Sequence, residues 1–63
     1  MTLETVEARV RAEFDEMPGL RLTITQASRL FGLDRDQCRM VVDRLVRMAY
    51  LRHTDGGAVT RAA

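Results

Sequence analysis

Arginine is the side chain with which this sequence could do the most specific chemistry. All ten basic residues of the 63-residue chain are arginines, and eight of them fall within residues 21–63. A guanidinium group presents its donors in a planar fork, which suits the paired acceptors of a phosphate group or of a guanine edge. A GC-rich genome would also produce an all-arginine set, so the composition by itself leaves both explanations open.

The charge is distributed unevenly along the chain. Residues 1–20 contain five acidic residues and two arginines, whereas residues 21–63 contain eight arginines and four aspartates. The formal net charge of the whole chain is only +1. If the protein binds a nucleic acid, the segment after residue 20 is therefore the part that we expect to face it.

The remaining residue types give little support to catalysis or metal binding. One cysteine, Cys38, and one histidine, His53, cannot supply the usual tetrahedral zinc ligands, and a single cysteine forms no intramolecular disulfide. The sequence has no glycine-rich phosphate loop and no recognisable catalytic constellation. We therefore expect no enzyme activity, no cofactor, no metal and no evident small-molecule ligand, with Cys38 as a small core residue.

The length and the hydropathy pattern limit the kind of protein that positions these side chains. Sixty-three residues allow a single domain, 1–63, with a small core. No apolar stretch approaches the ~18 residues of a membrane span, and the first residues lack the layout of a signal peptide. We therefore expect a cytoplasmic protein without a membrane partner.

Three helices are predicted from apolar residues that recur every three or four positions. The first runs from Leu3 to the Pro18-Gly19 stop, with Thr2 as its N-cap. The second covers residues 24–31, and the third runs from Arg35 to Met48 or Ala49. The apolar stripe of the first helix, which is expected to lie in the core, comprises Leu3, Val6, Val10, Phe14 and Met17.

Several residues between these helices have types that set helix ends and turns. Thr23 with Gln26, and Asp34 with Gln37, have the spacing of capping boxes. Gly32 is expected to take a positive φ and to close the second helix. Residues 20–22 are predicted to be short and extended, with a one-bridge strand as an alternative. The runs 50–54 and 58–61 flank Asp-Gly-Gly, which predicts a two-stranded hairpin.

The order of these elements resembles the winged helix-turn-helix superfamily, and the MarR-like transcription regulators most closely. The segments that carry the resemblance are LTITQASRLFGLDRD (22–36) and MVVDRLVRMAYLR (40–52), within a similar region of residues 20–61. The resemblance implies a mainly α fold with a small β part, in which three helices precede a C-terminal two-stranded β-hairpin wing. Ala49 stands where these families usually have glycine, and Asp36 and Asp43 stand where they often have Ser, Thr or Lys.

The resemblance also implies a function, namely that of a small DNA-binding transcription regulator that acts as a homodimer through the helix over residues 3–17. Helix 35–48 would enter the major groove, and the 51–61 hairpin would contact phosphates or the minor groove as a wing. The residues expected to contact double-stranded DNA are Thr25, Ser28, Arg35, Gln37, Arg39, Met40, Arg44, Arg52, His53 and Arg61.

Each of these assignments has a structural alternative. Arg44 could pair with Asp43 or with carboxylates of the first helix, and Arg35 could simply be solvated. Met40 could be a base contact, a subunit contact or an exposed methionine. The alternative function is that of a protein–protein interaction module with a winged-helix fold and no DNA binding. The near-zero net charge and the aspartates of the third helix favour that alternative.

Overall fold

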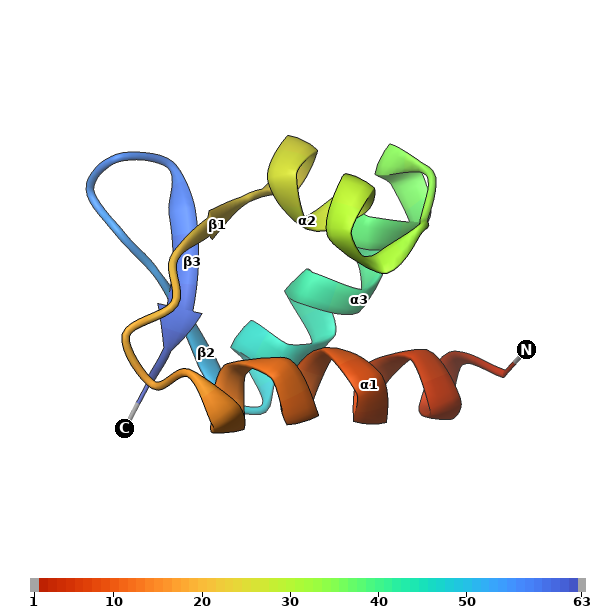
Figure 1. Cartoon of the computed structure of the whole chain (residues 1–63), viewed down its shortest axis with the longest axis horizontal. Coiled ribbons are helices and arrows are strands. Elements are labelled where there is room, and N and C mark those ends of the chain that lie inside the picture. The colour runs from red at the N-terminus through yellow and green to blue at the C-terminus, as the bar shows by residue number, and fades with distance from the viewer. Residues whose placement is uncertain (1, 63) are drawn as a thin grey trace.

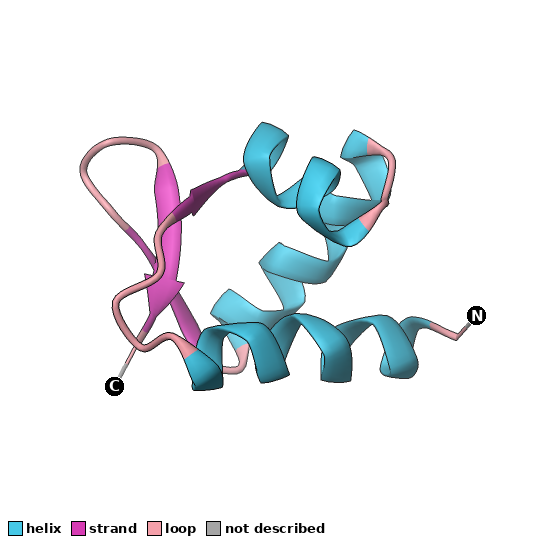
Figure 2. Ribbon diagram, viewed as in Figure 1, coloured by secondary structure: helices cyan, strands magenta, loops and turns pink. Residues whose placement is uncertain are grey.

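The computed structural model describes residues 2–62, which form three helices and a small antiparallel sheet (Figures 1 and 2). The elements are α1 (Leu3–Glu16), β1 (Leu22–Thr23), α2 (Ile24–Phe31), α3 (Arg35–Arg47), β2 (Leu51–His53) and β3 (Ala58–Arg61). The fold is mainly α with a small β part, as predicted. Within residues 2–62, no helix has the length and apolar character that crossing a membrane requires.

The sheet joins the predicted two-stranded hairpin to a third strand, β1, which lies where the sequence predicts a short extended segment or one-bridge strand. β3 lies between β2 and β1, and Leu22 of β1 lies opposite Val59 of β3. The predicted hairpin is formed by β2 and β3, in which Arg52 lies opposite Thr60. The segment before α2 is extended as expected, but it also pairs with β3. A strand of two residues is too short to show a period of its own, so its pairing leaves no signal in the sequence.

The hairpin turn has the chemistry that its Asp-Gly-Gly sequence predicts. The N–H of Thr54 donates to the carbonyl oxygen of Ala58 at 2.8 Å, and the N–H of Gly57 donates to the carbonyl oxygen of Thr54 at 3.2 Å. Gly57 has a φ of +80°, which glycine adopts without steric cost. This glycine therefore closes the loop between β2 and β3 (Figure 1).

The three predicted helix N-caps, Thr2, Thr23 and Asp34, are present, and one of the two predicted capping boxes is complete. Thr23 and Gln26 form both hydrogen bonds of a capping box at the start of α2. At the start of α3, Asp34 accepts from the N–H of Gln37 at 2.7 Å. No return bond from the Gln37 side chain to the backbone of Asp34 occurs within the described residues, so only half of the second predicted box forms.

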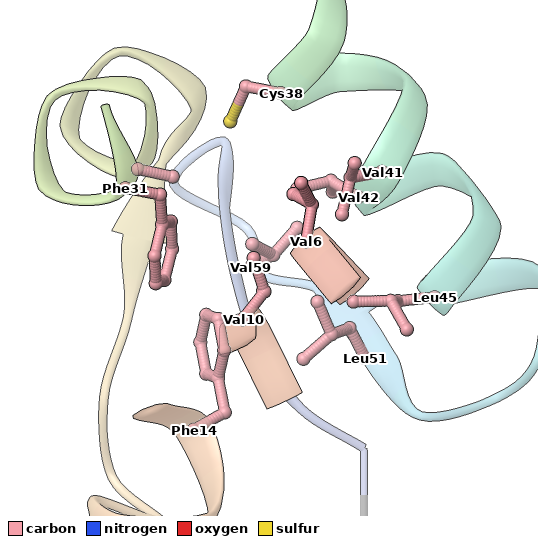
Figure 3. Close-up of a cluster of buried hydrophobic side chains, with 11 residues drawn as sticks. Val6, Val10, Phe14, Phe31, Cys38, Val41, Val42, Leu45, Leu51 and Val59 are labelled. Atoms are coloured by element: carbon pink, nitrogen blue, oxygen red, sulfur yellow. The ribbon is translucent and has the colours of Figure 1, made fainter. Parts of the chain in front are cut away.

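Side chains from all three helices and the sheet meet in one apolar core (Figure 3). Of the predicted stripe on α1, Val6, Val10 and Phe14 are buried, whereas Leu3 and Met17 at its ends are 37% and 48% exposed. The buried stripe is therefore shorter than predicted. The core residues are Val6, Val10, Phe14, Ala27, Phe31, Cys38, Val41, Val42, Leu45, Leu51 and Val59.

Cys38 lies in the core where α3 passes α2, as expected. Its thiol donates to the carbonyl oxygen of Ile24 across 3.7 Å, and burial raises the pKa of this thiol. A raised pKa disfavours the thiolate, which is the reactive form of cysteine. Cys38 is thus a packing residue in this fold.

Helix α3 ends at Arg47, one or two residues earlier than predicted, because the chain turns at Ala49. Ala49 has a φ of +61°. The N–H groups of Ala49 and Tyr50 donate to the carbonyl oxygens of Val46 and Leu45, each at 2.9 Å. These two bonds are the pattern of a Schellman motif, whose left-handed position usually holds glycine. Gly32, with a φ of +67°, occupies the equivalent position after α2.

Replacing Ala49 with glycine should stabilise the protein. Glycine removes the contact between Cβ and the backbone that penalises a positive φ, and we expect the free energy of unfolding to rise by about 1 kcal/mol. The matched control is Ala12→Gly at an exposed position of α1, which should lower stability by about 1 kcal/mol. Urea denaturation measures both values. A loss of stability in Ala49→Gly would contradict the strained turn described above.

Candidate functional site

Helix α3 divides its five predicted contact residues between two flanks. Gln37 and Met40 line a groove with Leu3 of α1, and Arg44 forms an ion pair with Glu7 of α1. These three residues of α3 therefore face α1. At 100° per residue, Arg39 lies about 140° around the helix axis from Arg44. Arg35 lies on the opposite flank as well, about 180° from Arg44, and both Arg35 and Arg39 are exposed.

The ion pair between α1 and α3 involves a buried carboxylate, Glu7, that is not among the residues predicted individually from the sequence. Glu7 is only 8% exposed, and its Oε2 accepts from Nε of Arg44. A signal was available, because Glu7 lies four residues after Leu3 and three before Val10, within the apolar stripe. The alternative interpretation of Arg44, as a partner for a carboxylate of the first helix, is confirmed.

A second polar cluster joins the end of α1 to the residues after α3. The hydroxyl of Tyr50 donates to Oδ1 of Asp15, and Nε of Arg61 lies 3.5 Å from the same oxygen. The guanidinium carbon of Arg11 lies 4.5 Å from the centre of the Tyr50 ring, within the range of a cation–π contact. Arg61, which was predicted to contact DNA from the wing, is therefore engaged by α1.

The two predicted residues of α2 differ in accessibility. Thr25 is exposed, whereas Ser28 is buried and its hydroxyl donates to the carbonyl oxygen of Thr25 at 2.8 Å. A hydroxyl has one proton to donate, so Ser28 has none left for a phosphate oxygen. Thr25 is the residue of this pair that could meet a ligand.

The remaining arginines of α3 are free to meet a ligand. Among residues 2–62, ion pairs are formed by Arg44 and Arg61 and by no other arginine. Arg35, Arg39 and Arg47 are exposed on α3 without such a partner. Asp36 and Asp43 are exposed on the same helix and dilute its positive charge.

The sheet contributes a basic hollow of about 380 Å³ beside the hairpin loop. Arg52 and His53, both predicted, line this hollow together with Arg21, which was not predicted. Arg21 precedes a two-residue strand, so only the strand pairing of β1 reveals that it lies near Arg52. No group of three or more His, Cys, Asp and Glu side chains in the described part of the chain could hold a metal ion.

The Glu7–Arg44 pair predicts an asymmetric response to mutation. Arg44→Ala leaves the Glu7 carboxylate buried without its cation, so we expect the free energy of unfolding to fall by about 2 kcal/mol. Glu7→Gln should cost less, because the amide oxygen can still accept from Nε of Arg44 and carries no charge to bury. Urea denaturation gives these values. Arg47→Ala is the control, and an equal effect of Arg44→Ala and Arg47→Ala would disprove the role of the pair.

Comparison with known proteins provides no relative from which a function could be transferred. No protein-family model matches the chain, and neither a curated protein nor a solved structure is significantly similar to it.

Proposed function

We propose that this chain is a winged helix-turn-helix protein that binds double-stranded DNA as a small cytoplasmic transcription regulator. The order of elements supports this proposal, since α2, the turn at Gly32 and α3 form two helices joined by a short glycine-containing turn. The β2–β3 hairpin follows α3 directly and would serve as the wing. In this arrangement α3 is the helix that enters the major groove.

The observation that carries the proposal is the division of the arginines between two environments. The carboxylates of α1 engage Arg44 and Arg61. Arg35 and Arg39, on the flank of α3 that faces away from α1, have no acidic partner among residues 2–62. A DNA duplex is a dense row of negative charge, and free guanidinium groups can meet both its phosphates and its guanine edges.

The structure refines the roles that we propose for the ten predicted residues. Arg35 and Arg39 would contact bases or phosphates in the major groove, and Thr25 would contact a backbone phosphate. Arg52 and His53 would contact the DNA from the wing. Arg44, Arg61 and Ser28 would act mainly by holding the fold together, and Gln37 and Met40 would lie at the edge of the interface nearest to α1.

A homodimer is part of the proposal, because one small module buries little surface on DNA. Helix α1 is the proposed dimer element. Leu3 of α1 and Met17, one residue after its end, are large exposed apolar side chains, and the acidic exposed residues of α1 would be repelled by DNA. Two chains bound to each duplex, measured by sedimentation equilibrium, would agree with this arrangement, and one chain would refute it.

DNA binding should be sensitive to salt and should depend on Arg39. Fluorescence anisotropy with a duplex of random sequence should show affinity that falls as salt rises. Arg39→Gln should weaken binding roughly tenfold at low salt and reduce the salt slope by about 1 if its contact is to a phosphate. The matched control is Arg9→Gln, which removes the same charge from α1 and should change affinity little. Absence of salt-sensitive binding by the native chain would refute the proposed function.

A second candidate function is favoured by the groove between α1 and α3. This groove has a volume of about 200 Å³, is lined mainly by apolar side chains, and includes Met40, which is 52% exposed. Exposed apolar surface of this kind is typical of protein-interaction sites. In that case the chain would be a protein–protein interaction module without DNA binding.

The substitution Met40→Asp separates the two candidate functions. If α3 reads DNA through Arg39, an added charge beside α1 should lower DNA affinity by less than about threefold, while Arg39→Gln acts strongly. If the groove is the functional surface, Met40→Asp should abolish capture of a protein partner in a pull-down, and no duplex should be retained. Circular dichroism of the variant provides the control for folding.

A further inference from the structure

The basic hollow on the sheet lies away from α3 and includes Arg52 and His53, the two wing residues that we propose to contact DNA. Arg21, Arg52, His53 and the loop residues Asp55 and Gly56 line it. Arg21 and Arg52 are exposed, and neither forms an ion pair within residues 2–62. The hollow is therefore lined by two guanidinium groups that have no acidic partner within residues 2–62.

The strand register explains why these two arginines come together. Arg52 of β2 lies opposite Thr60 of β3. Leu22 of β1 lies opposite Val59, so the preceding residue, Arg21, lies beside Thr60 from the other side. Residues directly opposite one another point to the same face of a sheet. Arg21 and Arg52 therefore belong to one face, with their Cα atoms about 10 Å apart across β3.

A hydrogen bond across the sheet holds Arg21 in place. The buried hydroxyl of Thr60 donates to the carbonyl oxygen of Leu20 at 2.8 Å, which fixes the residue before Arg21 against β3. Arg52 is fixed by its place in β2. The backbone positions of both arginines are thus set before any ligand arrives, which lowers the entropic cost of binding.

The hairpin loop lines the rest of the hollow with backbone N–H groups, which attract an anion, and with one carboxylate, which repels it. The backbone N–H groups of Asp55 and Gly56 donate no hydrogen bond within residues 2–62 and could serve an anion. The carboxylate of Asp55 is the one acidic group among the side chains that line the hollow, and it would oppose an anion there. Two arginines against one aspartate still leave the lining positively charged.

We infer that this hollow is a binding site for a phosphate group, held between Arg21 and Arg52 on the outer face of the sheet. Two arginines that lie on either side of β3, Arg21 before β1 and Arg52 in β2, can offer several charge-assisted hydrogen bonds to one tetrahedral anion. The phosphate could belong to a nucleic-acid backbone or to a free phosphate ester, because both offer the same oxygens. The site does not depend on DNA binding by α3.

Titration of the native chain with inorganic pyrophosphate at constant ionic strength tests this site. The Nε–Hε signals of Arg21 and Arg52 in ¹H–¹⁵N NMR spectra should shift with a saturable dependence on concentration, whereas that of Arg9 on α1 should not. Arg21→Gln and Arg52→Gln should each weaken binding roughly threefold or more, and Arg9→Gln should leave it unchanged. Asp55→Asn should tighten binding, since it removes the opposing charge and keeps a residue that suits the turn.

Repeating the titration with a DNA duplex distinguishes the two sources of phosphate. Shifts of the same signals, with competition by pyrophosphate, would identify the phosphate as one of the nucleic-acid backbone. Saturable binding of pyrophosphate without any effect of the duplex on these signals would identify a free phosphate ester. If Arg21 and Arg52 do not respond to either probe, or respond no more than Arg9, the site does not exist. Failure of the chain to bind any duplex would refute the proposed DNA function and leave the pyrophosphate result intact.

Discussion

A carboxylate within an apolar helix face is the constraint around which this small fold is arranged. Glu7 follows Val6 in the buried stripe of α1 and is equally inaccessible. An ionised carboxylate can be buried in such a place only where a cation meets it, because the unpaired charge would cost several kcal/mol. Arg44 is that cation. The pair therefore joins α1 to α3 beside the apolar core, to which α1 contributes Val6, Val10 and Phe14 (Figure 3).

The same pairing determines which positive charges remain available. Helix α1 runs beside α3 in the same direction (Figure 1). In the middle of α1, Glu7 binds an arginine, and near the sheet Asp15 does the same with Arg61 and also accepts from the hydroxyl of Tyr50. The acidic segment, residues 1–20, thus engages two arginines of the basic segment, residues 21–63, and leaves the other arginines of that segment exposed. This distribution separates a structural face of α3 from a free face. The weak net charge of the chain conceals that separation, because charges far apart in the fold cancel in the sum.

Local chemistry made much of the fold predictable, and tertiary contacts account for what was not. The capping box at Thr23, the left-handed Gly32 and the hairpin turn at Gly57 depend on residues a few positions apart, which a sequence displays directly. The burial of Glu7 depends on Arg44, 37 positions away, and the site of Arg21 depends on residues 31 or more positions away, reached through helix packing and strand register. Ala49 shows a third case. Its positive φ contradicts the preference of the residue, and the backbone bonds to Leu45 and Val46 impose it.

We propose the free flank of α3, and not its α1 flank, as the surface that meets DNA. An NMR titration of the native chain with a short duplex tests this claim residue by residue through the arginine Nε–Hε signals. Large shifts are expected for Arg35 and Arg39, and small shifts for Arg44, whose Nε remains bonded to Glu7. Large shifts at Arg44 with unchanged signals at Arg35 and Arg39 would contradict it.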